Sequence, residues 1–266
     1  MGKRLEVVGR VRTHSHDATA DTAFNNAPQL HPKTKGVEAT LGDIDNAAAW
    51  MSLLNVQSNP QDREVVDTVR DSVRLQVEAT DPGMCYRAGR IFIASPGAMT
   101  PFHMVKEHNF ILQLRGRKRI HLREHRDTAV VSERARDRFN RPHSRDLLQW
   151  REEFRERGRV FDLTLRMGAY MPSTSPHIVQ NGDEPSITMS FTHYTKATAH
   201  RAVLHRAHDM MSDAGSAPPA VGWSPIFDAT TAMAAELHAG AKRPRRRVVA
   251  APVSSDAERY AKVGGS

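Results

Sequence analysis

Two histidines lie in segments whose pattern favours a metal site. His103 follows a turn at residues 95–97, and His177 follows a Gly- and Pro-containing stretch at residues 168–172. Each histidine lies in or beside a segment with strand-like composition, and strands hold ligands more firmly than loops do. Imidazole binds Fe, Zn, Cu and Ni. The pair therefore indicates a transition-metal site, which one carboxylate would complete while leaving open positions for a cosubstrate and O₂.

The segments around these histidines alternate like short β-strands. We expect strands at residues 90–94, 109–114, 118–122, 160–165, 169–171, 177–180 and 186–193. The strands before and after Arg115-Gly-Arg should form a β-hairpin, because Gly116 accepts a positive φ angle. Many short strands with turn signals favour a barrel or a sandwich, so the predicted fold class is mainly β with α extensions.

Helical patterns flank and interrupt this β region. Residues 47–54 follow a capping signal and predict a short apolar helix, and residues 59–73 carry one apolar face. The heavily charged residues 124–159 predict a helical insertion, and residues 199–211 and 226–238 predict C-terminal helices. The expected division is an N-terminal arm with helices that pack on the core (1–88), a β core (89–195), C-terminal helices (196–240) and a basic, disordered tail (241–266).

Three motifs in the β core resemble a known family. They are Thr100-Pro-Phe-His, Asn109-Phe-Ile-Leu-Gln-Leu-Arg-Gly-Arg-Lys and Gly168-Ala-Tyr-Met-Pro-x₄-His. In order and spacing they are similar to motifs of the JmjC and cupin-like Fe(II)/2-oxoglutarate oxygenases, of the type that hydroxylates asparagine in hypoxia-inducible factor. The resemblance covers roughly residues 89–195. It implies a cupin-type double-stranded β-helix, or jelly roll, with helical N- and C-terminal flanks and both histidines on adjacent strands at the barrel mouth.

The resemblance also implies roles for single residues. His103 and His177 match the two histidine ligands of Fe(II). Lys118 matches the lysine that pairs with the distal carboxylate of 2-oxoglutarate, and strand parity places it on the same, inward face as Ile120. The other residues implied to lie at the cosubstrate are Thr100, which would hydrogen-bond the same carboxylate, Asn109 and Ser190.

One position departs from the family pattern. The family has Asp or Glu two residues after the first histidine, whereas this chain has Val105, which cannot bind a metal. Glu107 is the third ligand that we expect, although an extended strand would place it about 13 Å from His103, at ~3.3 Å per residue. The alternatives are His108, which strand parity places on the opposite side, and an external ligand such as water, chloride or substrate.

The composition of the chain excludes several classes of protein and limits the partners that we expect. The 266 residues include a single cysteine, Cys85, which excludes internal disulfides and cysteine-rich zinc sites. No apolar run is long enough to span a membrane and the charged start lacks a secretion signal, so we expect a cytoplasmic protein with no membrane partner. The net charge of +8 does not predict nucleic-acid binding, because the arginines of residues 124–159 are interleaved with Glu and Asp.

Two functions follow from these observations. The first is an Fe(II)/2-oxoglutarate-dependent dioxygenase that hydroxylates a small-molecule or peptide substrate. The second is a catalytically altered or inactive cupin-like protein that binds a metal or a ligand in a regulatory role. In either case the C-terminal helices are expected to support a homodimer. Val105 is the residue on which the choice between the two functions depends.

Overall fold

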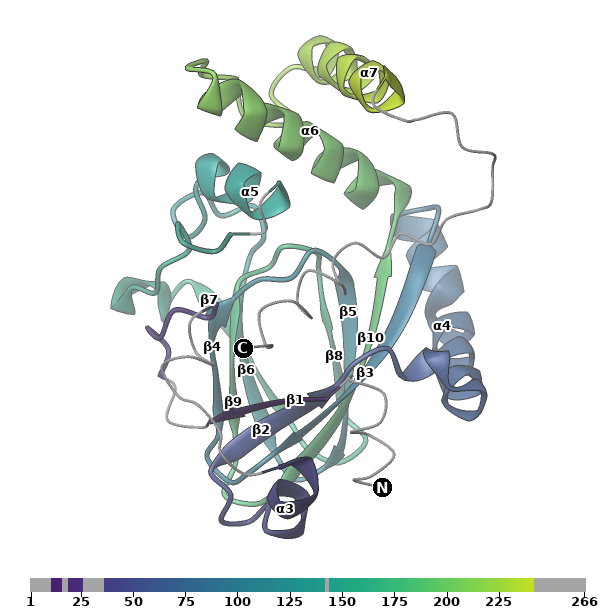
Figure 1. Ribbon diagram of the computed structural model, residues 1–266, viewed down its shortest axis with the longest axis vertical. Coiled ribbons are helices and arrows are strands. Elements are labelled where there is room, and N and C mark those ends of the chain that lie inside the picture. The colour runs from purple at the N-terminus through teal and green to yellow at the C-terminus, as the bar shows by residue number, and fades with distance from the viewer. Residues whose placement is uncertain (1–10, 16–18, 26–35, 142–143, 242–266) are drawn as a thin grey trace.

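The described part of the chain contains two antiparallel β-sheets that face each other (Figure 1). The computed structural model describes residues 11–15, 19–25, 36–141 and 144–241. The six-stranded sheet has the order β1 (Val11–Ser15), β2 (Ala49–Leu53), β3 (Cys85–Ala94), β10 (Ser186–Tyr194), β5 (His108–Arg115) and β8 (Gly168–Met171). The four-stranded sheet has the order β4 (Met99–His103), β9 (His177–Asn181), β6 (Lys118–Arg123) and β7 (Gly158–Leu163).

From β3 onward the chain passes repeatedly between the two sheets. Strands β3, β5, β8 and β10 belong to the six-stranded sheet, and β4, β6, β7 and β9 to the four-stranded sheet. This alternation is the winding of a double-stranded β-helix. The cupin-type, mainly β fold class expected from the sequence is therefore confirmed.

The predicted hairpin at Gly116 is wrong in its pairing. The turn is present, with Gly116 at φ +71°, but β5 pairs with β10 and β8, whereas β6 pairs with β9 and β7. The turn thus carries the chain from one sheet to the other. A side chain at Gly116 would meet the Pro185 carbonyl oxygen at 2.6 Å, so the close approach of the two turns requires glycine here.

The interior between the sheets is partly apolar and partly polar. Its apolar part consists of Ile111, Ile120, Leu163, Met171 and Val179. In contrast, the inward positions of β10 are all hydroxylated and buried: Ser186, Thr188, Ser190 and Thr192. A polar row inside a barrel must find hydrogen-bond partners, and it therefore marks the place where a polar ligand would lie.

Helices cover the outside of the barrel. Helix α4 (Pro60–Thr80) starts at the N-cap Asn59 and packs with Val66 on the outer face of the six-stranded sheet, near the 3-10 helix η1 (Val56–Ser58). Short helix α3 (Val37–Gly42) lies at one end of the barrel, and α6 (Lys196–Asp213) and α7 (Pro225–Ala241) lie at the other (Figure 1). Both predicted C-terminal helices are present in α6 and α7.

Two predicted helical segments have a different structure. Residues 49–53 of the predicted helix at 47–54 form β2, because pairing with β1 and β3 buries Trp50 and Met51, and this burial overrides local helix propensity. Within the charged region, the described residues 124–141 and 144–159 form two helical elements, helix α5 (Glu133–Asn140) and the 3-10 helix η2 (Glu152–Phe154). Turns fill much of the rest, where contacts such as that of Arg157 with Asp127 replace a continuous helix.

The ends of the chain are described only in part. The predicted N-terminal arm is described at residues 11–15 and 19–25, and the predicted basic tail beyond Ala241 lies outside the described residues. Among the described residues, every helix is too short or too polar to cross a lipid bilayer. The division into four domains stays a prediction.

Candidate metal and cosubstrate site

The two predicted metal ligands are neighbours in the structure. His103 at the end of β4 pairs directly with His177 at the start of β9, and their ring centroids are 4.1 Å apart. A register shift separates this pair from the next, in which Thr100 lies opposite Val179. Three residue steps on β4 thus oppose two on β9, a bulge that turns both Thr100 and His103 to the inner face.

Both imidazoles hydrogen-bond a backbone carbonyl through Nδ1. His103 Nδ1 lies 2.8 Å from the Pro101 carbonyl oxygen, and His177 Nδ1 lies 2.9 Å from that of Ser175. A carbonyl only accepts hydrogen bonds, so each Nδ1 carries the proton and each Nε2 keeps its lone pair. Burial lowers the pKa of His177 to about 4, and burial and the neighbouring His177 hold the pKa of His103 well below its usual value. Both rings are therefore neutral near pH 7.

The described part of the chain brings no third protein ligand to this pair. Glu107 accepts a 3.0 Å hydrogen bond from Arg90 Nη2, and among the described residues no three His, Cys, Asp or Glu side chains are grouped to hold a metal ion. His108 lies on the other side of its strand, where Nε2 is 2.6 Å from Thr198 Oγ1. The Val105 backbone carbonyl oxygen accepts a 2.8 Å hydrogen bond from Thr174 N. The arrangement supports neither Glu107 nor His108 as the third ligand.

Lys118 lies inside the barrel, as strand parity predicted. Its side chain is buried, and burial alone lowers its pKa to about 7. Nζ donates a 2.6 Å hydrogen bond to Thr188 Oγ1, which in turn donates to Gln113 Oε1 at 2.8 Å. No carboxylate of the described residues forms an ion pair with Lys118. A bound carboxylate would supply the counter-ion that this buried ammonium group lacks among the described residues.

The remaining predicted cosubstrate residues also face the interior. Ser190 Oγ donates a 2.7 Å hydrogen bond to Asn109 Oδ1, and both residues are buried. Thr100 is half-buried opposite Val179, and Asn181, two residues further along β9, pairs with Lys118. The predicted residues of the metal site and of the cosubstrate site, apart from Glu107, therefore share one inner surface.

Sequence patterns did not identify several residues of this inner surface. Thr188 and Gln113 form the hydrogen-bond chain behind Lys118, and Asn181 has a buried Oδ1 atom with no hydrogen-bond partner. The alternation of hydroxyl residues along β10 was a signal that could have identified Thr188. Asn181 offered no such signal, because its importance depends on β9 lying beside β6.

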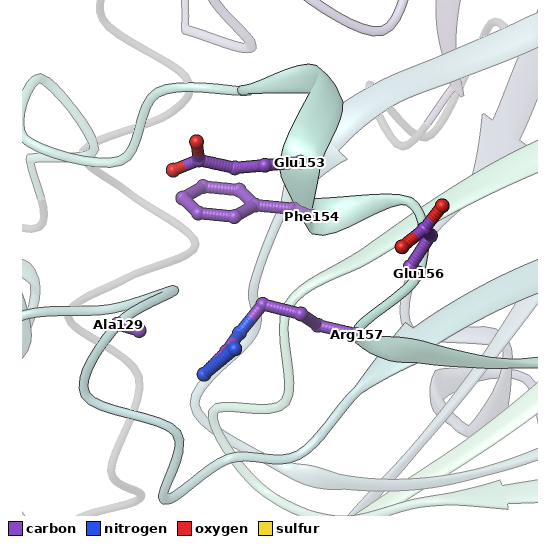
Figure 2. Close-up of a pocket in the computed structure, with 5 residues that line it drawn as sticks. All are labelled: Ala129, Glu153, Phe154, Glu156 and Arg157. Carbon is purple, nitrogen blue, oxygen red and sulfur yellow. The ribbon is translucent and has the colours of Figure 1, made fainter.

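A groove of about 410 Å³ lies elsewhere on the molecule (Figure 2). Figure 2 shows the Phe154 ring beside the Glu153 side chain, with Arg157 on the opposite wall. The remaining lining residues are Ala129 and Glu156, so the whole lining comes from the segment between β6 and β7. The groove contains no histidine and none of the residues around Lys118, so we do not assign the metal or cosubstrate chemistry to it.

Comparisons with known proteins bear on the fold. No protein-family model and no curated protein match the chain. The structure of E. coli YcfD is 16% identical, with a TM-score of 0.47 over 96% of this chain and 67% of YcfD. A second structure, of YcfD as a ribosomal oxygenase in complex with cobalt and 2-oxoglutarate, is 14% identical, with a TM-score of 0.45 over 99% of this chain and 58% of that chain.

Other solved structures match only part of the chain. The DMSP lyase DddQ from Ruegeria pomeroyi is 14% identical, with a TM-score of 0.27 over 41% of this chain. The chain spans 38% of the length of that lyase. At these identities and TM-scores no activity, substrate or ligand is transferred to this chain. The double-stranded β-helix follows from its own strand pairing.

Proposed function

We propose that the chain is an Fe(II)/2-oxoglutarate-dependent oxygenase that hydroxylates a small-molecule or peptide substrate. The observation that supports this proposal most is Lys118, a buried ammonium group without a carboxylate partner among the described residues, facing the same interior as two neutral histidines. Burying an unpaired cation costs several kcal/mol, so this position is explained best by a ligand that brings a carboxylate.

Each residue of the site has a role in this proposal. Lys118 and Thr100 would bind the distal carboxylate of 2-oxoglutarate, Thr188 would orient Lys118, and His103 and His177 would bind Fe(II) through Nε2. When bound, the metal and the cosubstrate would together supply the oxidising chemistry. The apolar side chains around Ile120 exclude water from the space between the sheets and so strengthen the interaction of Lys118 with a carboxylate.

The site fits the cosubstrate better than it fits the metal. The buried cation and the hydroxyl groups suit a dicarboxylate. The described residues offer the metal two imidazoles and no carboxylate, because Val105 replaces the acidic residue and Glu107 is bound to Arg90. These two observations favour a second candidate function, a catalytically altered cupin-like protein that binds the dicarboxylate in a regulatory role. Turnover by the first candidate requires a water or substrate atom as the third ligand.

Fe(II)-dependent succinate formation from 2-oxoglutarate separates the two candidates. The wild type, Val105→Asp and Lys118→Met are compared, with Val160→Asp as a control at an exposed position of β7. Succinate formation by the wild type that Lys118→Met abolishes supports the oxygenase. Binding of 2-oxoglutarate without turnover, together with turnover gained by Val105→Asp, supports the regulatory protein. If the wild type does not bind 2-oxoglutarate at all, both proposals fail.

The proposal includes a cytoplasmic homodimer that forms through α7. Ile226, Met233 and Leu237 follow one another at helical spacing and are 80%, 60% and 68% exposed. The helix has no Lys or Arg, so this apolar stripe matches a second copy of itself better than a charged partner. Light scattering should give a dimer mass for the wild type and a monomer mass for Met233→Glu. A wild-type monomer at high concentration would contradict this part of the proposal.

A further inference from the structure

We propose that residues 19–25 form a clasp whose Phe24 ring fixes the orientation of His103 and restricts access to the histidine pair. The inference rests on the proposed function only in taking that pair as the metal site. Its geometry involves neither 2-oxoglutarate nor turnover. Phe24 is a positioning residue in this account, because it acts on a metal through His103.

The contact between Phe24 and His103 is a parallel stack. The two ring centroids are 4.3 Å apart and the ring planes differ by 10°. His177 lies against His103 at 4.1 Å with an interplanar angle of 55°, so His103 has an aromatic neighbour in Phe24 and another in His177. A stack covers the face of an imidazole, over which a bulky reagent approaches, and leaves the in-plane lone pair of Nε2 to a metal ion. Phe24 thus restrains rotation of the ring without occupying the ligand position.

Arg145 holds the clasp beside His103 through hydrogen bonds. Its Nε and Nη2 donate to the Met104 carbonyl oxygen at 3.1 and 3.0 Å, and its Nη1 donates to Asn25 Oδ1 at 3.0 Å. The guanidinium lies 4.8 Å from the Phe24 ring and 4.9 Å from the Phe139 ring. This buried arginine therefore ties the clasp to the chain immediately after the ligand histidine.

The other end of the clasp is attached to the exposed edge of a sheet. Strand β4 is the last strand of its sheet, and Phe102 N donates a 3.2 Å hydrogen bond to the Ala20 carbonyl oxygen. Within residues 19–25 the even-numbered side chains are half-buried and the odd-numbered ones are exposed. Only one side of the clasp touches the barrel, so it closes over the site without becoming part of the core.

The stack has a specific consequence because no described residue supplies a third ligand. In a complete triad the metal itself helps to hold both imidazoles, whereas here Val105 leaves the two rings to be held by the protein. Groups that orient a ligand histidine commonly change metal affinity by about 10- to 100-fold when removed. Loss of the Phe24 ring should therefore weaken metal binding and expose His103 to reagents.

The test uses the full chain without metal or 2-oxoglutarate. Diethyl pyrocarbonate modifies neutral imidazole, and peptide mass spectrometry gives the modification rate at His103 and at His208, which is buried far along α6. Phe24→Ala should raise the modification rate at His103 about fivefold, in line with the free energy of a stacked aromatic pair. The rate at His208 should not change. Phe24→Tyr should restore the wild-type rate, and Tyr86→Ala, an exposed aromatic position, serves as the matched control.

Cobalt(II) affinity, measured by absorbance titration, is the second readout. Phe24→Ala should bind cobalt about tenfold more weakly than the wild type and Phe24→Tyr. An unchanged rate at His103 in Phe24→Ala overturns the proposal, and so does an equal rise at His103 and His208, which would show a loss of fold. Because neither readout involves 2-oxoglutarate, a failure of the oxygenase proposal would leave this result intact.

Discussion

Lys118 Nζ, on β6 of the four-stranded sheet, donates a 2.6 Å hydrogen bond to Thr188 Oγ1, on β10 of the six-stranded sheet. The bond crosses the interior of the barrel and continues to Gln113. An ammonium group has three donors, and the hydrogen bond to Thr188 uses one of them. The strand pairing therefore holds a cation in the interior in a position to bind an anion.

The affinity for 2-oxoglutarate should fall above neutral pH. Burial places the pKa of Lys118 at about 7, so the group is charged below this pH and increasingly neutral above it. Only the charged form attracts a carboxylate, and the affinity should decrease by about tenfold per pH unit above pH 7. Calorimetric titrations between about pH 6 and pH 9 measure this slope. A constant affinity over that range would contradict the assignment of Lys118.

The stability of the ligand-free protein should rise with pH in the same region. The pKa of Lys118 is about 7 in the folded protein and 10.5 in the unfolded chain, so the unfolded state binds more protons between these values. Stability therefore increases from about pH 7 towards pH 10, by an amount on the order of a few kcal/mol. Urea unfolding of the wild type should show this rise and Lys118→Met should lack it. Parallel pH profiles would contradict the lowered pKa of Lys118 in the folded protein.

Ser190→Ala should destabilise the protein by about 1–3 kcal/mol, because Asn109 Oδ1 loses its hydrogen-bond donor inside the barrel. Urea unfolding at constant pH gives the difference in the free energy of unfolding. Ser72→Ala is the matched control, since the Ser72 hydroxyl is exposed on α4 and donates to the Val69 carbonyl oxygen of its own helix. Equal effects of the two substitutions would show that the pair of Asn109 and Ser190 contributes nothing.

Asp209→Asn should destabilise the contact between α5 and α6. The Asp209 carboxylate is fully buried and lies within ion-pair distance of Arg134, Arg138 and Arg141. Removing the charge from such a group commonly lowers the free energy of unfolding by about 3 kcal/mol. Asp213 contacts the same arginines but is 39% exposed, so Asp213→Asn should lower it by less than about 1 kcal/mol. Thermal unfolding of both variants tests this order, and equal losses would contradict it.

The position of Lys118 could be predicted from the sequence because strand parity along residues 118–122 is local information. The placement of His103 and His177 on adjacent strands was implied by the resemblance of the motifs to a known family, and the pairing of β4 with β9 agrees with it. The hairpin at Gly116 was predicted wrongly because one turn signal serves both a hairpin and a step between sheets. Which of the two forms depends on pairing with β8, β9 and β10, which lie far along the chain.

The parts of the site that escaped prediction depend on distant partners. Glu107 is bound by Arg90 from the neighbouring region of the barrel, and no local pattern indicates this pair. The stack of Phe24 on His103 joins residues that the sequence leaves in separate segments. The residues 47–54 show the same limit for secondary structure, since their Ala-rich start favours a helix until β1 and β3 are present to pair with β2.

Binding of 2-oxoglutarate to the wild type, Lys118→Met and Arg119→Met tests the central claim most directly. Arg119 is the matched control, because it follows Lys118 on β6 but faces outward and pairs with exposed Asp162. Equilibrium titration should show binding by the wild type and Arg119→Met, and about 10- to 100-fold weaker binding by Lys118→Met, the loss expected for a hydrogen bond to a charged group. Equal affinities of the wild type and Lys118→Met would contradict the claim.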